Sequence, residues 1–193
     1  MAGTLHNLNN IRAFIAVDVS IKDAIKSLQQ ELLDDAGWTP QQAKPVKIEN
    51  FHITLFFLGN IPSEVVEKVK TKIAEVEFDP IDITFAGIGA FPYPTSARVI
   101  WVGVGQGAQE LVCLAEDVVQ KLSEIGFKPD RPFSPHLTVL RVKADRLKMP
   151  VEILTKFMNK SIASDIINEL HLKRSDPIPS GVLYTDIFTV YAR

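Results

Sequence analysis

The stretch FHITLFFLG, residues 51–59, is an apolar run that carries a histidine and a threonine close to its start. The stretch FSPHLTVLRV, residues 133–142, repeats this arrangement later in the chain. Alternate residues of a β-strand point to the same face of its sheet. We therefore expect His52 and Thr54 to project together from one strand, and His136 and Thr138 to project together from another.

The two motifs lie in halves of the chain that share an order of predicted elements. Each half offers strands, a helix and one His-x-Thr strand, and no low-complexity segment or long linker separates them. The last two predicted strands are joined by SDPIPSG, residues 175–181, which indicates a hairpin. We therefore predict an α+β fold of two interlocked, pseudo-twofold lobes. Each lobe is expected to be an antiparallel sheet with helices on its outer face, and an active cleft is expected between the lobes.

Hydrophobic periodicity and turn residues locate the predicted elements along the chain. Helices are predicted at residues 20–35, 62–76, 108–125 and 151–158, and strands at 11–19, 51–59, 81–91, 97–104, 133–142, 166–174 and 182–192. Ser20 with Asp23 predicts a helix N-terminus, and Ser63 is predicted as a second N-cap. Gly126 lies where a C-terminal glycine is expected after the third helix.

The composition fits one globular domain spanning residues 1–193, with residues 1–10 as a flexible leader. The formal net charge of −2 excludes a uniformly basic nucleic-acid-binding protein. No apolar run approaches the roughly 18 residues of a membrane span, so no membrane association is expected. The single cysteine, Cys113, indicates a reducing compartment, and we predict a cytoplasmic protein.

The side chains of the two motifs suit phosphoryl chemistry if their strands face one cleft. Histidine titrates near neutral pH, so one imidazole can accept a proton from water while the other donates a proton to a leaving oxygen. A threonine hydroxyl can donate a hydrogen bond to a phosphate oxygen without adding charge.

Two other readings of these residues stay open, and the sequence argues against a third. A lone histidine in a strand is often a hydrogen-bonded core residue. A zinc site would need further ligands, for which Glu49 and Asp130 are the nearest carboxylates in sequence. A serine hydrolase would need a strained nucleophile turn, and Ser134 before Pro135 does not provide one. Cys113 lies in a helical apolar pattern that core packing explains.

The segments KIENFHITLFFLG, residues 47–59, and GFKPDRPFSPHLTVLRV, residues 126–142, resemble the signature segments of the 2H phosphoesterases. The resemblance is strongest to the branch of RNA 2′,3′-cyclic phosphodiesterases, also called 2′-5′ RNA ligase-like proteins. IRAFIAVDVS, RVIWVGV, LHLKRS and GVLYTDIFTVY resemble further strands of that branch. The resemblance therefore extends over most of the chain.

This resemblance implies hydrolysis of a terminal ribose 2′,3′-cyclic phosphate to a 2′-phosphate, without a metal or other cofactor. It implies that His52 donates a proton to the departing O3′ and that His136 activates water. It implies that Thr54 and Thr138 hold phosphate oxygens. The partners implied are RNA 3′ ends or nucleotides that carry the cyclic phosphate, and we expect a monomer.

Two residues follow their histidines by five positions. Arg141 occupies a place where the branch carries a phosphate-contacting arginine, and Phe57 occupies the equivalent place in the first motif. Regular alternation puts each on the face opposite its histidine. Arg141 would then reach phosphate only if the strand ends or bulges, and a core position is expected for Phe57 rather than base stacking.

Other activities remain open for such a chain. One is 2′-5′ RNA ligation, the reverse reaction, and another is a non-catalytic nucleotide- or RNA-binding module. The basic stretch that contains Arg141, Lys143, Arg146 and Lys148 is either an RNA-backbone patch or a solvated loop.

Overall fold

The computed structural model describes residues 10–143, 147–158, 160–179 and 181–193. Its elements in chain order are β1 (Asn10–Asp18), α1 (Lys22–Ala36), β2 (Ala43–Pro45), the 3₁₀ turn η1 (Ile48–Asn50), β3 (His52–Pro62), α2 (Ser63–Ile73), β4 (Ile81–Phe91), the 3₁₀ turn η2 (Pro94–Ser96), β5 (Val99–Val104), α3 (Ala108–Ser123), β6 (His136–Val142), α4 (Val151–Phe157), β7 (Ser161–Ile167), β8 (Glu169–Ile178) and β9 (Gly181–Tyr191).

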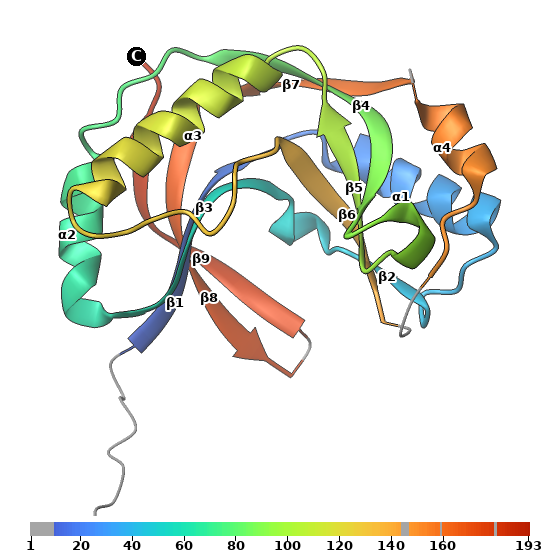
Figure 1. Cartoon of the computed structure of the whole chain (residues 1–193), viewed down its shortest axis with the longest axis horizontal. Coiled ribbons are helices and arrows are strands. Elements are labelled where there is room, and N and C mark those ends of the chain that lie inside the picture. The colour runs from blue at the N-terminus through green and yellow to red at the C-terminus, as the bar shows by residue number, and fades with distance from the viewer. Residues whose placement is uncertain (1–9, 144–146, 159, 180) are drawn as a thin grey trace, which may run out of the picture.

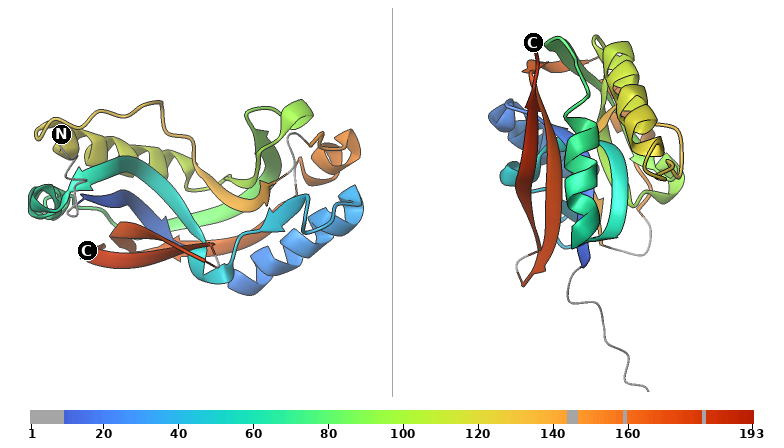
Figure 2. Two further views of the ribbon diagram at one scale, coloured as in Figure 1. Left: turned by 90° about the horizontal axis from the view of Figure 1, so that it is seen from below. Right: turned by 90° about the vertical axis from the view of Figure 1, so that its left-hand side faces the viewer.

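The strands form two antiparallel sheets, which confirms the predicted α+β class (Figures 1 and 2). The first sheet has the order β3-β1-β8-β9, and the second has the order β2-β6-β5-β4-β7. The final hairpin is present as the antiparallel pair β8–β9. One His-x-Thr strand therefore lies in each sheet.

Helices cover one face of each sheet (Figure 1). Helices α2 and α3 contact each other and strand β3 of the first sheet. Helices α1 and α4 contact each other, and they pack on β6, β7 and β4 of the second sheet. The apolar stripe of α1 explains its packing, because Ile25, Leu28 and Leu32 are all buried.

The two halves of the chain are interlocked in this arrangement. Strand β4 comes from the first half but pairs with β5 in the second sheet. Strands β8 and β9 come from the second half but complete the first sheet beside β1. Helix α1 follows β1 of the first sheet and packs on the second sheet. Helix α3 follows β5 of the second sheet and packs on β3 of the first. Each sheet therefore depends on both halves.

Some local predictions were wrong. Helix α1 begins at Lys22 without a side-chain cap, because the backbone N–H and hydroxyl of Ser20 both donate to the buried Asp165 carboxylate, at 2.6 and 2.5 Å. Helix α2 includes Ser63 and also has no side-chain cap. The strand predicted at 166–174 is divided at Asn168 between β7 of the second sheet and β8 of the first.

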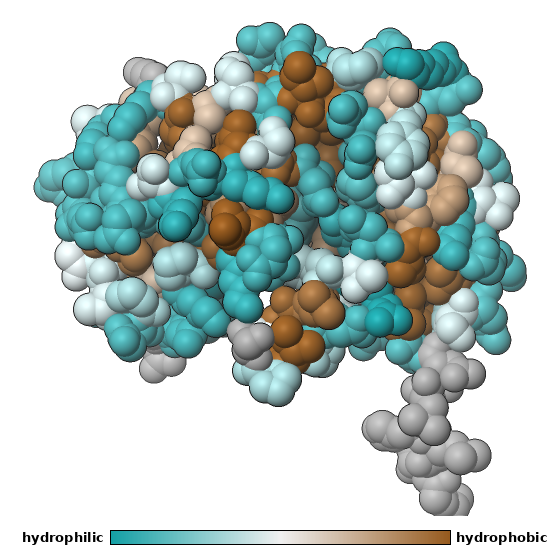
Figure 3. All heavy atoms as spheres, turned by 180° about the vertical axis from the view of Figure 1, so that it is seen from behind, coloured by the Kyte–Doolittle hydropathy of each residue, from teal (hydrophilic) through white to brown (hydrophobic). Residues whose placement is uncertain are grey.

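The predicted leader falls outside the described residues, except that Asn10 already belongs to β1. Arg146 of the basic stretch is also outside them. Within the described residues, no helix has the length and apolar character needed to cross a membrane. The face opposite the view of Figure 1 is largely hydrophilic, with hydrophobic patches between polar residues (Figure 3).

Candidate active site

The first motif lies at the start of β3, beside strand β1. His52 is opposite Asp18, and Thr54 is opposite Ala16. Ile53 is fully buried in the core, whereas His52 and Thr54 are only partly buried. The histidine and the threonine therefore share the face of the first sheet that points away from its core, as the alternation predicted.

The second motif repeats this arrangement at the start of β6. His136 is opposite Gly103, and Thr138 is opposite Trp101 of β5. Leu137 is buried in the core, whereas His136 and Thr138 are partly buried. Strands β3 and β6 also contact each other across the two sheets. The fold thus brings two matched motifs together from distant parts of the sequence.

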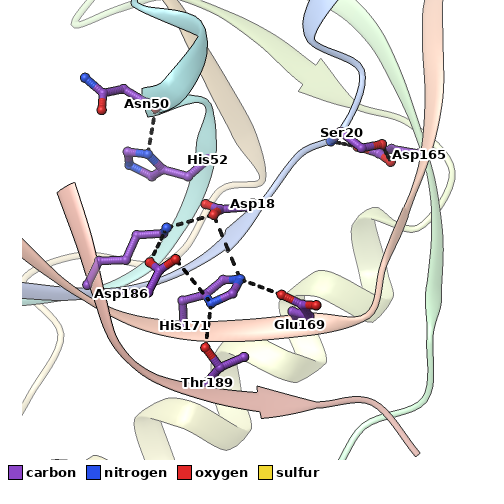
Figure 4. Close-up of polar contacts among 10 residues, drawn as sticks. Asp18, Ser20, Asn50, His52, Asp165, Glu169, His171, Asp186 and Thr189 are labelled. Atoms are coloured by element: carbon purple, nitrogen blue, oxygen red, sulfur yellow. Dashed lines mark hydrogen bonds and ion pairs between the residues drawn. The ribbon is translucent and has the colours of Figure 1, made fainter. Parts of the chain in front are cut away.

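Each histidine is held by a backbone carbonyl two residues before it. The Nδ1 atom of His52 lies 2.8 Å from the carbonyl oxygen of Asn50, and Nδ1 of His136 lies 2.7 Å from that of Ser134 (Figure 4 for His52). A carbonyl oxygen can only accept a hydrogen bond, so Nδ1 must carry the proton in both rings. The other ring nitrogen, Nε2, is then the atom that can gain or lose a proton in each histidine.

Two aromatic rings enclose each imidazole. Phe14 and Tyr184 lie 5.0 and 5.1 Å from the ring of His52, measured between centroids. Phe91 and Trp101 lie 4.9 and 6.1 Å from the ring of His136. These aromatic neighbours reduce the contact of both imidazoles with water, although both rings stay partly exposed.

This burial controls the protonation of the pair. Burial, assisted by the nearby charges of Lys173 and Arg141, lowers the pKa of His52 to about 4, although the Asn50 carbonyl and Asp18 oppose the shift. Burial and the charge of Arg131 lower the pKa of His136 below its usual value. In the free protein both rings are therefore neutral at pH 7.

A β-bulge returns Arg141 to the face of its histidine. In the pairing of β5 with β6, Ile100 is opposite Leu140 while Trp101 is opposite Thr138, so Val139 is an extra residue. Val139 and Leu140 are both buried, and Arg141 is exposed on the same side as His136. This is the condition under which the sequence predicted that Arg141 could reach a phosphate.

The first motif contains the same irregularity, and here it overturns an expectation. Leu55 is the extra residue, because Ile15 is opposite Phe56 while Ala16 is opposite Thr54. Leu55 and Phe56 are both buried, and Phe57 is 56% exposed on the side of His52. The core position predicted for Phe57 is therefore wrong, and its ring is available to a ligand beside Phe14, at 6.2 Å between centroids.

The two sheets influence each other electrostatically at this site. Arg141, on the second sheet, is close enough to His52, on the first, for its charge to lower the pKa of that histidine. Among the described residues, no hydrogen-bond partner occupies the hydroxyl of Thr54 or of Thr138. The site thus combines two imidazoles in the same tautomer, two threonine hydroxyls without a hydrogen-bond partner and one guanidinium. These groups together suit the binding of an oxyanion such as phosphate.

A separate polar network lies on the same face of the first sheet (Figure 4). Lys173 is 6% exposed and donates to Asp18 at 2.7 Å and to Asp186 at 2.5 Å. His171 lies beside it, with Nδ1 3.0 Å from the hydroxyl oxygen of Thr189. The network fixes the carboxylate of Asp18 next to His52.

This network also bears on the alternative of a metal site. In the described part of the chain, the residues grouped closely enough to hold a metal ion are Asp18, His171 and Asp186, and the ammonium of Lys173 already lies among their carboxylates. That group includes neither His52 nor His136, and it includes neither Glu49 nor Asp130.

Cys113 is an exposed thiol on α3, outside the core in which the sequence placed it.

The sequence did not identify the residues that surround the motifs. Phe14, Phe91, Trp101 and Tyr184 come from four other strands, and nothing in their local pattern marks them. The contacts made by the carbonyls of Asn50 and Ser134 had one indication in the sequence. Each of these residues stands two positions before its histidine.

Comparison with known proteins agrees with this geometry. The family model described as LigT like Phosphoesterase matches the chain twice, over residues 15–101 and 102–184, with one histidine motif in each match. The chain belongs to this family. It is therefore a phosphoesterase, and each of its two halves matches the family model.

Relatives of this phosphoesterase span nearly its whole length. An RNA 2′,3′-cyclic phosphodiesterase of Archaeoglobus fulgidus is 39% identical over 179 residues, which cover 92% of this chain and 98% of the relative. A protein of the same name from Aeropyrum pernix is 36% identical, covering 83% and 93%. A crystal structure of a Thermus thermophilus protein has a TM-score of 0.76 at 25% identity, covering 94% of this chain and 97% of that one.

Proposed function

We propose that this phosphoesterase hydrolyses the 2′,3′-cyclic phosphate at the 3′ end of RNA and leaves a 2′-phosphate. The paired histidines support this most directly, because both present Nε2 as the titrating atom and both are held by the same contact. The names of the relatives support the substrate class.

In the proposed reaction, His136 acts as the base and His52 as the acid. The neutral Nε2 of His136 takes a proton from water, and the water oxygen forms a bond to phosphorus. The bond between phosphorus and O3′ breaks as protonated His52 gives its proton to O3′. The products are a 2′-phosphomonoester and a free 3′-hydroxyl. Proton exchange with solvent then returns His136 to its neutral form and His52 to its protonated form.

The remaining residues are proposed to hold the substrate. Thr54 and Thr138 donate hydrogen bonds to the two non-bridging phosphate oxygens, whose charge grows in the transition state. Arg141 neutralises the negative charge of the phosphate. Phe57, exposed beside the site, offers a flat apolar surface on which the terminal base stacks.

The regiochemistry of a small substrate tests the proposal. Incubation with 2′,3′-cyclic AMP should yield 2′-AMP, which chromatography separates from 3′-AMP. Formation of 3′-AMP would show that the acid protonates O2′ and would refute the assignment of His52. No turnover of either this nucleotide or a cyclic-phosphate-ended oligonucleotide would refute the function.

A further inference from the structure

Two cations face each other across neighbouring strands next to the site. Lys44 of the edge strand β2 lies directly opposite Arg141 of β6. The residue before it, Ala43, is fully buried, so the side chain of Lys44 points to the face that carries Arg141. Residues in such a cross-strand pair have Cβ atoms about 4.5–5.5 Å apart, and like charges there repel each other.

No carboxylate of the described residues relieves this repulsion. Neither Lys44 nor Arg141 takes part in an ion pair within that part of the chain. The lysines of the outer surface are mixed in this respect, because Lys26 also has no ion pair among the described residues while other lysines do. Several of them are paired with glutamate or aspartate at 2.6–3.0 Å, namely Lys70, Lys72, Lys121, Lys156 and Lys160. What sets this pair apart is that two such cations face each other beside the site, so a ligand anion between them would relieve their repulsion.

The pair has more positive charge than the cyclic phosphate requires. A 2′,3′-cyclic phosphate carries one negative charge, which the guanidinium of Arg141 can balance. The hydroxyls of Thr54 and Thr138 add hydrogen bonds without adding charge. Lys44 lies one strand further out, at the edge of the second sheet. In an RNA chain, the next negative group is the phosphodiester on the 5′ side of the terminal nucleotide. A mononucleoside cyclic phosphate lacks that group.

We propose that Lys44 binds this 5′ phosphodiester and so makes the enzyme prefer RNA chains to mononucleoside cyclic phosphates. This inference rests on the proposed function and extends it to a subsite outside the reacting atoms. Lys44 is a specificity-determining residue in this account. Its effect should therefore depend on whether the substrate has a second phosphate.

The test compares Lys44→Gln with the wild-type enzyme on 2′,3′-cyclic AMP and on a diadenosine with one internal phosphodiester and a terminal 2′,3′-cyclic phosphate. Loss of a charge-assisted hydrogen bond should lower kcat/KM on the dinucleotide about tenfold or more. The value for 2′,3′-cyclic AMP should stay within about twofold. Lys26→Gln removes the same charge from the exposed face of α1 and should change neither value.

Salt dependence gives a second readout that a structural effect would not move. Each single-strand phosphate contact contributes about 0.7 to the slope of log affinity against log salt. The slope of log KM for the dinucleotide should therefore decrease by about that amount in Lys44→Gln. Equal losses on both substrates, or an unchanged slope, would overturn the subsite alone. Wild-type enzyme that hydrolyses neither substrate would instead overturn the proposed function, and the subsite with it.

Discussion

At the scale of single residues, the two histidines form a matched pair in which Nε2 is the ring nitrogen left free of the carbonyl contact. Their Nδ1 atoms are engaged by the carbonyls of Asn50 and Ser134, which removes the choice of tautomer. The sequence correctly placed the histidine and the threonine of each motif on one face of a strand, because alternation alone does so, while their roles stay predictions. It could not predict the protonation state, because the aromatic walls come from strands far away in the chain.

His52→Ala and His136→Ala should each reduce kcat by about 10²- to 10⁴-fold, since each removes one proton transfer. The double variant should lose much less than the product of the two losses, because both groups act in one transition state. Steady-state kinetics on 2′,3′-cyclic AMP measures this, with circular dichroism to verify the fold. Near-wild-type activity of either single variant would contradict the site.

The roles of the two histidines are separable with a modified substrate. A better leaving group at O3′ needs less protonation, so it should restore activity to His52→Ala more than to His136→Ala. Equal restoration in both variants would contradict the assignment of acid and base, while leaving the site itself intact.

The pH dependence follows from the lowered pKa values. The productive free enzyme has one ring protonated and one neutral, a form most abundant between the two apparent pKa values of the pair. Burial lowers both pKa values below the ordinary 6.5, and that of His52 to about 4. The profile of kcat/KM should therefore be bell-shaped with its maximum below pH 6.5, and it should fall tenfold per pH unit on its alkaline side.

The profile of kcat should lie at higher pH than that of kcat/KM. The negative charge of the bound cyclic phosphate favours the protonated imidazoles and raises both pKa values in the complex. Initial rates from pH 4 to 9 at low and at saturating substrate measure the two profiles. A kcat/KM maximum above pH 7.5 would contradict the protonation states derived from the burial of the rings.

At the scale of elements, the matched β-bulges decide what the strands present to the ligand. Regular alternation would direct Arg141 and Phe57 away from their histidines. The extra residues Val139 and Leu55 reverse that direction. A sequence of consecutive apolar residues does not reveal a bulge, because an extra buried residue looks the same as a strand buried on both faces. The error on Phe57 has this cause.

The bulge in β6 turns Arg141 to the side of His136, where we expect it to bind the substrate phosphate. Arg141→Ala should raise KM for 2′,3′-cyclic AMP more than it lowers kcat, because the guanidinium meets a charge that the substrate already has before reaction. Lys26→Ala is the matched control, since it removes a cation from the exposed side of α1. An unchanged KM with a collapsed kcat would reject this role.

At the scale of the whole molecule, the sequence predicted the two interlocked lobes but not the manner of their interlocking. The predicted strand at 166–174 runs through Asn168, where the chain passes from the second sheet to the first. Buried apolar residues lie on both sides of that point, Ile167 before it and Leu170 after it, so the sequence pattern does not mark the break. Only the pairing with distant strands divides it. The monomeric state and the cytoplasmic location stay predictions.

The distribution of ligating side chains over the molecule predicts the effect of chelators. Neither His52 nor His136 belongs to a group of three potential metal ligands among the described residues. The one such group there is Asp18, His171 and Asp186, and Lys173 already pairs with both of its carboxylates. Turnover of 2′,3′-cyclic AMP should therefore be unchanged after dialysis against EDTA. Activity that is lost in EDTA and restored by added zinc or manganese would contradict a reaction carried out by the histidines alone.

The exchange of strands and helices between the halves has a consequence for ancestry. Each family repeat supplies one histidine, yet it sends its later strands into the sheet begun by the other repeat. A single repeat on its own would leave both of its partial sheets unfinished. Two identical copies would complete each other as a twofold homodimer, with one shared active site made of one histidine from each. Duplication and fusion of such a gene would give a chain of this arrangement, in which equivalent positions, such as those of Phe57 and Arg141, are free to carry different residues.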